Sequence, residues 1–185
     1  GTELNKNLKR VRTDGAKYLQ NIISSGHGST LEHISASFIF ANVSRVLTHE
    51  LVRHRVGTAI SQESGRFVRG DDFSVWLPKS LQRANLPDKL LQEIEDHFIE
   101  TKELYLQILQ TAAAHELGAE VDLESMDAFD SLSFSKKKAY TSAARRLLPI
   151  GLSTTIGWTA NIRSLRHIIQ LRTHPAAEEE IRLIF

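Results

Sequence analysis

One short segment alternates between apolar and hydroxyl-bearing residues in a chain whose other patterns are mainly helical. In "HISASFIFANV", residues 33–43, the apolar side chains fall on one side of an extended chain and the serines on the other: Ile34, Ala36, Phe38 and Phe40 against Ser35 and Ser37. A period of two is that of a β-strand with one covered face. The β-branched stretch "PIGLSTTIGWTA" predicts a second extended segment. Few strands among many helices predict an α+β fold, mostly helical, with a small antiparallel sheet in a single domain over residues 1–185.

The remaining apolar patterns recur at helical spacing. Helices are predicted at Glu3–Ser24, 43–54, from about Asn85 to His115, 135–148 with Ser135 as its cap, 161–172, and 176–183. Glycines indicate a loop at 24–30, and "GAEVDLESMDAFDSL" indicates an acidic connection.

Composition excludes several classes of function. The chain has 185 residues, a formal net charge of +1 and no cysteine. The near-neutral charge argues against a nucleic-acid or membrane partner, and no apolar run is long enough to span a bilayer. The first residues lack the apolar core of a signal peptide, which predicts a cytoplasmic protein. Without cysteine there is no disulfide, thiolate metal site or thiol nucleophile. The histidine spacings do not match zinc motifs, so no metal site is expected.

Two predicted helices carry charged residues on their apolar faces. Glu50 and His54 fall on the apolar side of the 43–54 helix, and Arg172 ends the apolar stripe of the 161–172 helix. Buried charges require partners. Glu50 and His54 therefore form either a satisfied buried pair or part of a site. Arg172 either makes a salt bridge, to Glu50 or Glu32, or binds a planar anion.

The stretch "LVRHRVGTAISQESGRF" at 51–67 also has two readings. Its arginines and hydroxyl side chains indicate either a charged helix end that runs into a loop or a site for an anionic ligand. Arg145 and Arg146 close another predicted helix before Pro149, and attraction to the helix C-terminus explains one of them.

Four ordered blocks covering most of the chain resemble the flavin-dependent thymidylate synthases. "THELVRHR" followed by "SQESGRF" resembles the family signature of R-H-R, seven residues, serine, and an arginine two residues further on. The other blocks are "GHGSTLEH" at 26–33, "ARRLLP" at 144–149 and "NIRSLRHIIQLR" at 161–172. The resemblance implies the fold of that family and a flavoprotein methyltransferase of nucleotide biosynthesis.

The implied reaction is methylation of dUMP to dTMP. Methylenetetrahydrofolate would donate the carbon, NADPH would supply the electrons and FAD would carry the hydride. The classical thymidylate synthases use a cysteine nucleophile, whereas the resembled family works without one, in agreement with a chain that lacks cysteine. The resemblance also implies a homotetramer with active sites shared between subunits.

The resemblance assigns roles to individual residues. Arg172 would be catalytic and activate the base. The residues implied to bind dUMP are Glu50, Gln62, Ser64, Arg66, Arg145, Leu171 and Arg172. The residues implied to bind FAD are His27, Ser29, Arg53, His54, Arg55, Asn161, Arg163 and His167.

The chain departs from the family pattern at several places. Eight residues, rather than seven, separate Arg55 from Ser64, and the extra one lies in "VGTAI" at 56–60, where the loop is predicted to bulge. Glu50 stands where the family usually has glutamine, and Ala176 stands where it often has a flavin-contacting histidine, for which His174 is a substitute. The strand and helix that usually open the family are expected to be partly absent. These departures motivate the alternative of a non-catalytic flavin- or nucleotide-binding homologue with a regulatory role.

Overall fold

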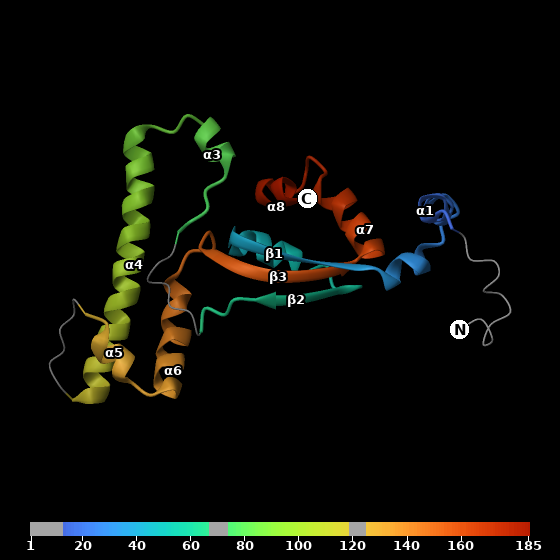
Figure 1. Cartoon of the computed structure of the whole chain (residues 1–185). Coiled ribbons are helices and arrows are strands. Elements are labelled where there is room, and N and C mark those ends of the chain that lie inside the picture. The colour runs from blue at the N-terminus through green and yellow to red at the C-terminus, as the bar shows by residue number, and fades with distance from the viewer. Residues whose placement is uncertain (1–12, 67–73, 119–124) are drawn as a thin grey trace.

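A computed structural model describes residues 13–66, 74–118 and 125–185 (Figure 1). The elements in chain order are α1 (Gly15–Ser24), η2 (Gly28–His33), β1 (Ser35–Ser44), α2 (Arg45–Leu51), β2 (Thr58–Gln62), α3 (Lys79–Arg83), α4 (Asp88–Leu117), α5 (Asp127–Ser131), α6 (Phe134–Ala144), η4 (Arg145–Leu147), β3 (Ser153–Asn161), α7 (Ile162–Arg172) and α8 (Glu179–Ile184). Helices predominate around one small sheet, as the sequence predicts.

The sheet is antiparallel, with the strand order β1-β3-β2. Its central strand β3 alternates between buried and half-buried residues, because one of its faces is covered and the other is not. The register of β1 against β3 shifts between Phe40 and Val43, where Asn42 adopts a left-handed conformation with φ 56°. Asparagine tolerates this region better than most residues. The shift turns the end of β1 directly into α2.

Helices α2, α7 and α8 cover one face of the sheet. The core between them consists of Val43, Leu47, Leu51, Ile156, Trp158, Ala160, Ile168 and Ile181. Trp158 is fully buried there and meets the ring of Phe185 edge-on at 5.6 Å between centroids. Burial of an aromatic side chain of this size contributes strongly to stability. This core fixes α2 and α7 on the same face of β3.

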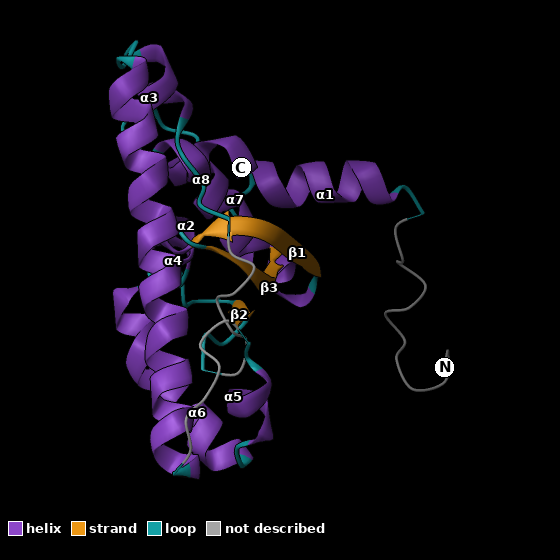
Figure 2. Ribbon diagram, turned by 90° about the vertical axis from the view of Figure 1, so that its left-hand side faces the viewer, coloured by secondary structure: helices purple, strands orange, loops and turns teal. Residues whose placement is uncertain are grey.

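A second core lies between α4, α5 and α6, beyond the end of the sheet and away from α1 (Figures 1 and 2). Its buried members are Tyr105, Leu109, Ala113, Phe129, Leu132 and Ala144. Short α3 connects this part to the sheet layer, because the Ser80 N–H donates to the Glu179 carboxylate of α8 at 3.0 Å. Within the described residues, no helix combines the length and the apolar character needed to cross a bilayer.

Several element boundaries differ from the predicted ones. The 43–54 helix is shorter, because residues 43 and 44 finish β1 and Ser44 caps a helix that ends at Leu51. His54 therefore lies beyond the helix. The first helix begins at Gly15 under an Asp14 cap, and residues 3–12 of its predicted span lie outside the described part. Ser133, rather than Ser135, precedes α6.

Other boundaries agree or add detail. The predicted long helix, the 161–172 helix and the last helix are confirmed as α4, α7 and α8. The glycine loop passes into the 3-10 turn η2, and the described end of the acidic connection forms α5. Helix α3 was not predicted, since its five residues are too few to show a periodic pattern.

Candidate functional site

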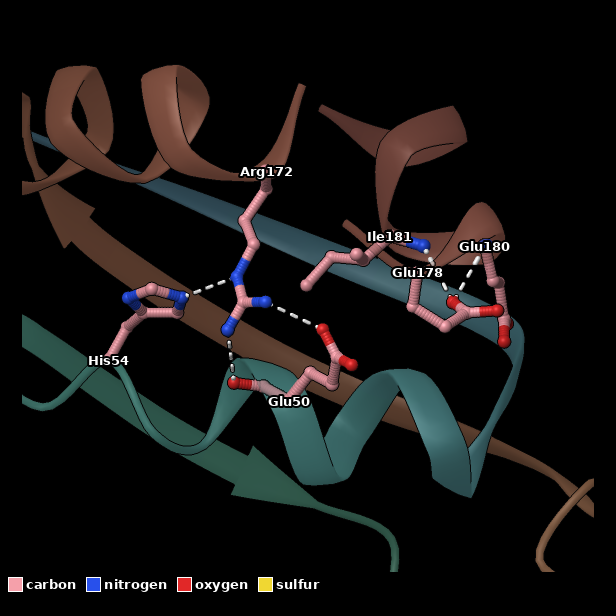
Figure 3. Close-up of polar contacts among 6 residues, drawn as sticks. All are labelled: Glu50, His54, Arg172, Glu178, Glu180 and Ile181. Carbon is pink, nitrogen blue, oxygen red and sulfur yellow. Dashed lines mark hydrogen bonds and ion pairs between the residues drawn. The ribbon is translucent and has the colours of Figure 1, made fainter. Parts of the chain in front are cut away.

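Arg172, Glu50 and His54 meet where the last residue of α7 faces the end of α2 (Figure 3). The Arg172 guanidinium donates from Nη1 to Glu50 Oε2 at 2.6 Å and from Nε to His54 Nε2 at 2.8 Å. Nη2 adds a longer contact, 3.4 Å, to the Glu50 carbonyl. The expected Glu50 salt bridge is therefore present, and His54 joins it. The pair is only partly buried, so a ligand has access to it.

A buried carboxylate on α8 holds the beginning of α2. Glu180, 3% exposed, accepts the backbone N–H of Ser44 at 2.7 Å and the Ser44 hydroxyl. The same hydroxyl oxygen accepts the N–H of Leu47 and so caps the helix. Burial raises the pKa of the Glu180 carboxyl, and the bonds from Ser44 oppose that shift. Both ends of α2 are thus anchored to the C-terminal helices.

A pocket of about 740 Å³ opens next to His54. Its walls come from the loop after α2, from η2 and from α7, and the lining residues are Glu32, Arg53, His54, Arg55, Val56, Gly57, Asn161, Arg163, Ser164, His167 and Ile168. Arg163 forms an ion pair with Glu32. The guanidinium groups of Arg53 and Arg55 have no partner within the described part of the chain. The pocket therefore offers two unpaired cations to an anionic ligand.

The floor of this pocket is a tight turn held by α7. Gly57 has φ +68°, and a Cβ there would overlap the side chains of Asn161 and Ser164. Asn161 caps α7 through a bond from Ser164 N at 2.8 Å, and the Ser164 hydroxyl donates to the Val56 carbonyl at 2.6 Å. The stretch "VGTAI", where the extra residue predicts that the loop bulges, begins with this turn at residues 56 and 57. The turn at Gly57 precedes β2, which keeps an unbroken register with β3 from Thr58 to Gln62.

A second basic group lies at the other end of α2. A Cβ on Gly65 would come within 3.0 Å of Arg45 Nη2 and 4.0 Å of Arg145 Cδ, so the Ser64–Arg66 turn adjoins both arginines. Burial, followed by repulsion from Arg145, lowers the pKa of Arg45, and Glu63 opposes this. Two neighbouring cations with one opposing carboxylate favour an added anion.

Arg45 is absent from the residues predicted for the site. In the structure Arg45 is the first residue of α2, where a cation faces the positive end of the helix dipole, a mildly unfavourable location. Periodicity hid this location, because residues 43–54 read as one helix with Arg45 inside. Ser44 is the signal that could have revealed it, since serine is a preferred N-cap residue.

The two adjacent arginines before Pro149 have different partners. Arg146 donates from Nη1 to the carbonyl of Ser142 at 3.0 Å and interacts with the end of α6, as the sequence predicts for one of the pair. The side chain of Arg145 has no partner within the described residues and lies near Gly65. Arg145 is therefore the one available to a ligand.

The structure gives fewer contacts for the other residues predicted to belong to the site. Leu171 is 48% exposed next to Arg172, and Gln62 ends β2. Ser64 and Arg66 form a turn, with the Arg66 N–H donating to Ser64 Oγ at 3.3 Å. His27 and Ser29 do not line the large pocket. Their neighbours Gly26 and Gly28 line an adjoining one of about 310 Å³, which shares Arg163 and His167 with it. His174 Nδ1 accepts the N–H of Ala176 in an exposed turn.

This site brings arginines from separate helical segments together beside a small antiparallel sheet, an arrangement suited to anionic ligands. The chain belongs to the family described as thymidylate synthase complementing protein, which matches residues 2–185. It is similar to proteins called flavin-dependent thymidylate synthase. One from Mycobacteroides abscessus is 36% identical over 89% of this chain and 60% of its own length. One from Mycobacterium tuberculosis is 35% identical over 90% of this chain and 61% of its own length. The chain thus spans about 60% of the length of these curated relatives.

Proposed function

We propose that the protein converts dUMP to dTMP, with methylenetetrahydrofolate as carbon donor and NADPH as reductant in an FAD-dependent reaction. One observation carries the proposal. Arginines from three helical segments gather at the two ends of α2, and at each end at least one guanidinium has no partner, or has unused donors, among the described residues. Membership of the family and the likeness to flavin-dependent thymidylate synthases support this reading.

The large pocket suits a flavin dinucleotide. Arg53 and Arg55 are unpaired there among the described residues, and a pyrophosphate matches the fixed geometry of guanidinium donors. We assign them to the pyrophosphate or the flavin ring, with Asn161, Arg163 and His167 on the α7 side of the pocket. His27 and Ser29 complete the assignment from the adjoining loop. FAD bound there would supply, from NADPH, the hydride that reduces the transferred methylene carbon to the methyl group of dTMP.

The nucleotide would lie along α2. Arg45, Arg145, Ser64 and Arg66 bind its phosphate, and Gln62, Glu50, Leu171 and Arg172 surround its base. Arg45 and Glu50 lie five positions apart along the chain, which corresponds to about 7.5 Å of helical rise. This separation is comparable to the length of a nucleoside monophosphate. One helix thus presents a cation to the phosphate and a carboxylate–arginine pair to the base.

Arg172 is the residue we assign to base activation. Uracil carbonyl oxygens gain negative charge as C5 becomes nucleophilic, and a preorganised guanidinium stabilises such charge. Three of its five N–H groups are used by Glu50 and His54. The two remaining donors have no partner within the described residues and are available to the base.

The homotetramer and the cytoplasmic location belong to this proposal. Association is supported by apolar side chains exposed along α4, namely Leu90, Leu91, Ile99, Leu104, Ile108 and Leu117. Such exposure is typical of surfaces that pack against another chain. Light scattering after size-exclusion chromatography would show four chains per particle, and a monomer that still forms dTMP would contradict shared active sites.

Flavin binding and turnover test the function in two steps. Purified protein mixed with FAD is expected to retain flavin absorbance through gel filtration, and loss of all flavin would contradict the assignment. Tritium release from dUMP labelled at C5, with folate and NADPH present, then measures the reaction. Protein that keeps flavin and dUMP without turnover fits the alternative, a non-catalytic binder. In Arg172→Ala, turnover should fall by about 100-fold or more with flavin still bound.

A further inference from the structure

The bond between Arg172 and His54 determines the protonation state of the histidine. A guanidinium has donors and no acceptor, so Arg172 Nε, 2.8 Å from His54 Nε2, must donate to that nitrogen. Nε2 therefore carries no proton, and the imidazole is neutral with its hydrogen on Nδ1. The arginine partner removes the ambiguity that usually accompanies the choice of a histidine tautomer.

The backbone of His54 is held firmly enough to orient its ring. Its N–H donates to the Leu51 carbonyl at 3.1 Å, and its own carbonyl accepts the Thr58 hydroxyl at 2.5 Å. These bonds fix the loop between α2 and β2 at both sides of the residue. The ring then meets Arg172 from the side opposite to the Glu50 carboxylate (Figure 3).

Short contacts on two different atoms hold the guanidinium plane better than one. Glu50 makes a short contact only to Nη1, at 2.6 Å, because its carbonyl lies 3.4 Å from Nη2, and the 2.8 Å bond from Nε to His54 adds the second short contact. We propose that His54 is a positioning residue for Arg172. The neutral imidazole of His54 orients the two unused N–H groups of Arg172 toward the bound base. This deepens the function proposed above and rests on it only for the nature of the ligand.

The surroundings of His54 keep the ring neutral. Burial is the largest cause that lowers the pKa of His54, followed by the charge of Arg172 and then His167, both on α7. Arg53 and Arg55 flank it in its own loop, and Glu32 and Arg163 line the same pocket. The carboxylate of Glu50, on the other side of Arg172, is already bonded to that arginine. A proton on Nε2 would remove the acceptor for the Arg172 Nε–H and place a second cation beside the guanidinium. The bond between Arg172 and His54 is therefore lost as pH falls through the lowered pKa of His54.

NMR of the full chain, labelled in its histidines and arginines, tests the contact without turnover. We expect His54 to show the neutral form with the proton on Nδ1, and to titrate below an ordinary histidine. The Nε–H signal of Arg172 should persist at neutral pH and disappear as His54 titrates. The Arg172 Nε–H signal should be weakened in His54→Leu. In His54→Gln the signal should survive to lower pH, because glutamine offers an acceptor that does not titrate.

Kinetics then show whether the contact matters for the reaction. His54→Leu is expected to lower kcat by about 10- to 100-fold, with a smaller change in the affinity for FAD. His54→Gln should recover part of kcat and move the acid limb of the pH profile. His49→Gln is the matched control, since His49 is an exposed histidine of α2 outside the site.

The two proposals fail in different ways. An Arg172 Nε–H signal that is unchanged in His54→Leu, or a His54 that titrates as a free histidine, overturns the positioning role. So does a His54→Leu variant that loses FAD while its kcat with saturating FAD is normal. The expected NMR behaviour in a protein that forms no dTMP would instead support the contact and contradict the proposed function.

Discussion

Arg172 and Glu50 lie 122 residues apart in the sequence, and their side chains form an ion pair with 2.6 Å between Nη1 and Oε2. The pair joins the end of α7 to α2 and leaves two guanidinium donors unused among the described residues. It satisfies a carboxylate that the helical pattern places on an apolar face. The same contact therefore stabilises the fold and prepares Arg172 for a ligand.

Glu50→Gln should keep most of the activity and lose some stability. Glutamine retains an oxygen that accepts from Arg172, but it removes the charge, and the pair is only partly buried. We expect the free energy of unfolding in urea to fall by about 1 kcal/mol. The kcat should stay within about tenfold of wild type, because the bonds to His54 and to the Glu50 carbonyl remain. Glu50→Ala serves as comparison and should lose more of both, whereas equal losses in the two variants would show that the acceptor oxygen is unimportant.

The neighbours Arg145 and Arg146 provide a matched pair for the phosphate site. Arg145→Ala is expected to raise the KM for dUMP by about 10- to 100-fold, because a charge-assisted contact to the phosphate is lost. Arg146→Ala should leave that KM unchanged and lower the free energy of unfolding by about 0.5 to 1 kcal/mol, since the bonds of Arg146 to the described residues go to the end of α6. Steady-state kinetics and thermal unfolding measure the two effects. The assignment fails if the variants exchange these phenotypes.

Gly57→Ala should destabilise the protein more than Gly118→Ala does, although the two substitutions cause similar backbone strain, and it should also damage the flavin pocket. Both Gly57 and Gly118 are left-handed, with φ +68° and +62°, so alanine costs about 1 kcal/mol at either one. Only Gly57 has Asn161 and Ser164 against its Cα, which adds roughly 1 to 3 kcal/mol of steric conflict. Urea unfolding of Gly57→Ala and Gly118→Ala should reveal this difference, together with weaker FAD binding for Gly57→Ala alone. Equal unfolding free energies would contradict the close approach at this turn.

The buried carboxyl of Glu180 gives a pH dependence of stability with a defined sign. Burial raises its folded-state pKa above the ordinary value of about 4.5. As pH rises, the Glu180 carboxyl therefore loses its proton in the unfolded chain before it does so in the folded protein. The contribution of Glu180 to stability is complete at pH values below the unfolded-state pKa. It is lost as pH rises through the folded-state pKa. The free energy of unfolding of wild type, relative to that of Glu180→Gln, should decrease as pH rises above about 4.5. Urea denaturation over a pH series measures it, and parallel profiles would refute the shift.

Local patterns in the sequence were sufficient for the elements that carry the site. The alternation at 33–43 and the β-branched residues before Asn161 correspond to β1 and β3, and Asn161 caps α7 as an N-terminal asparagine is expected to do. The pattern was insufficient where two elements overlap. Val43 continues the helical stripe of α2 but belongs to β1, so the predicted helix was too long and Arg45 was missed.

The sequence by itself determined the types of side chain available, their order along the chain, the small sheet among helices and the absence of a thiol. The tertiary structure alone decided which of these groups meet. Arg172 touches Glu50 and His54 because α2 and α7 lie on the same face of β3, and Arg145 rather than Arg146 lies beside Gly65 because α6 ends there. Periodicity is a property of neighbouring residues, whereas these contacts depend on how a shared apolar core places distant helices against one another.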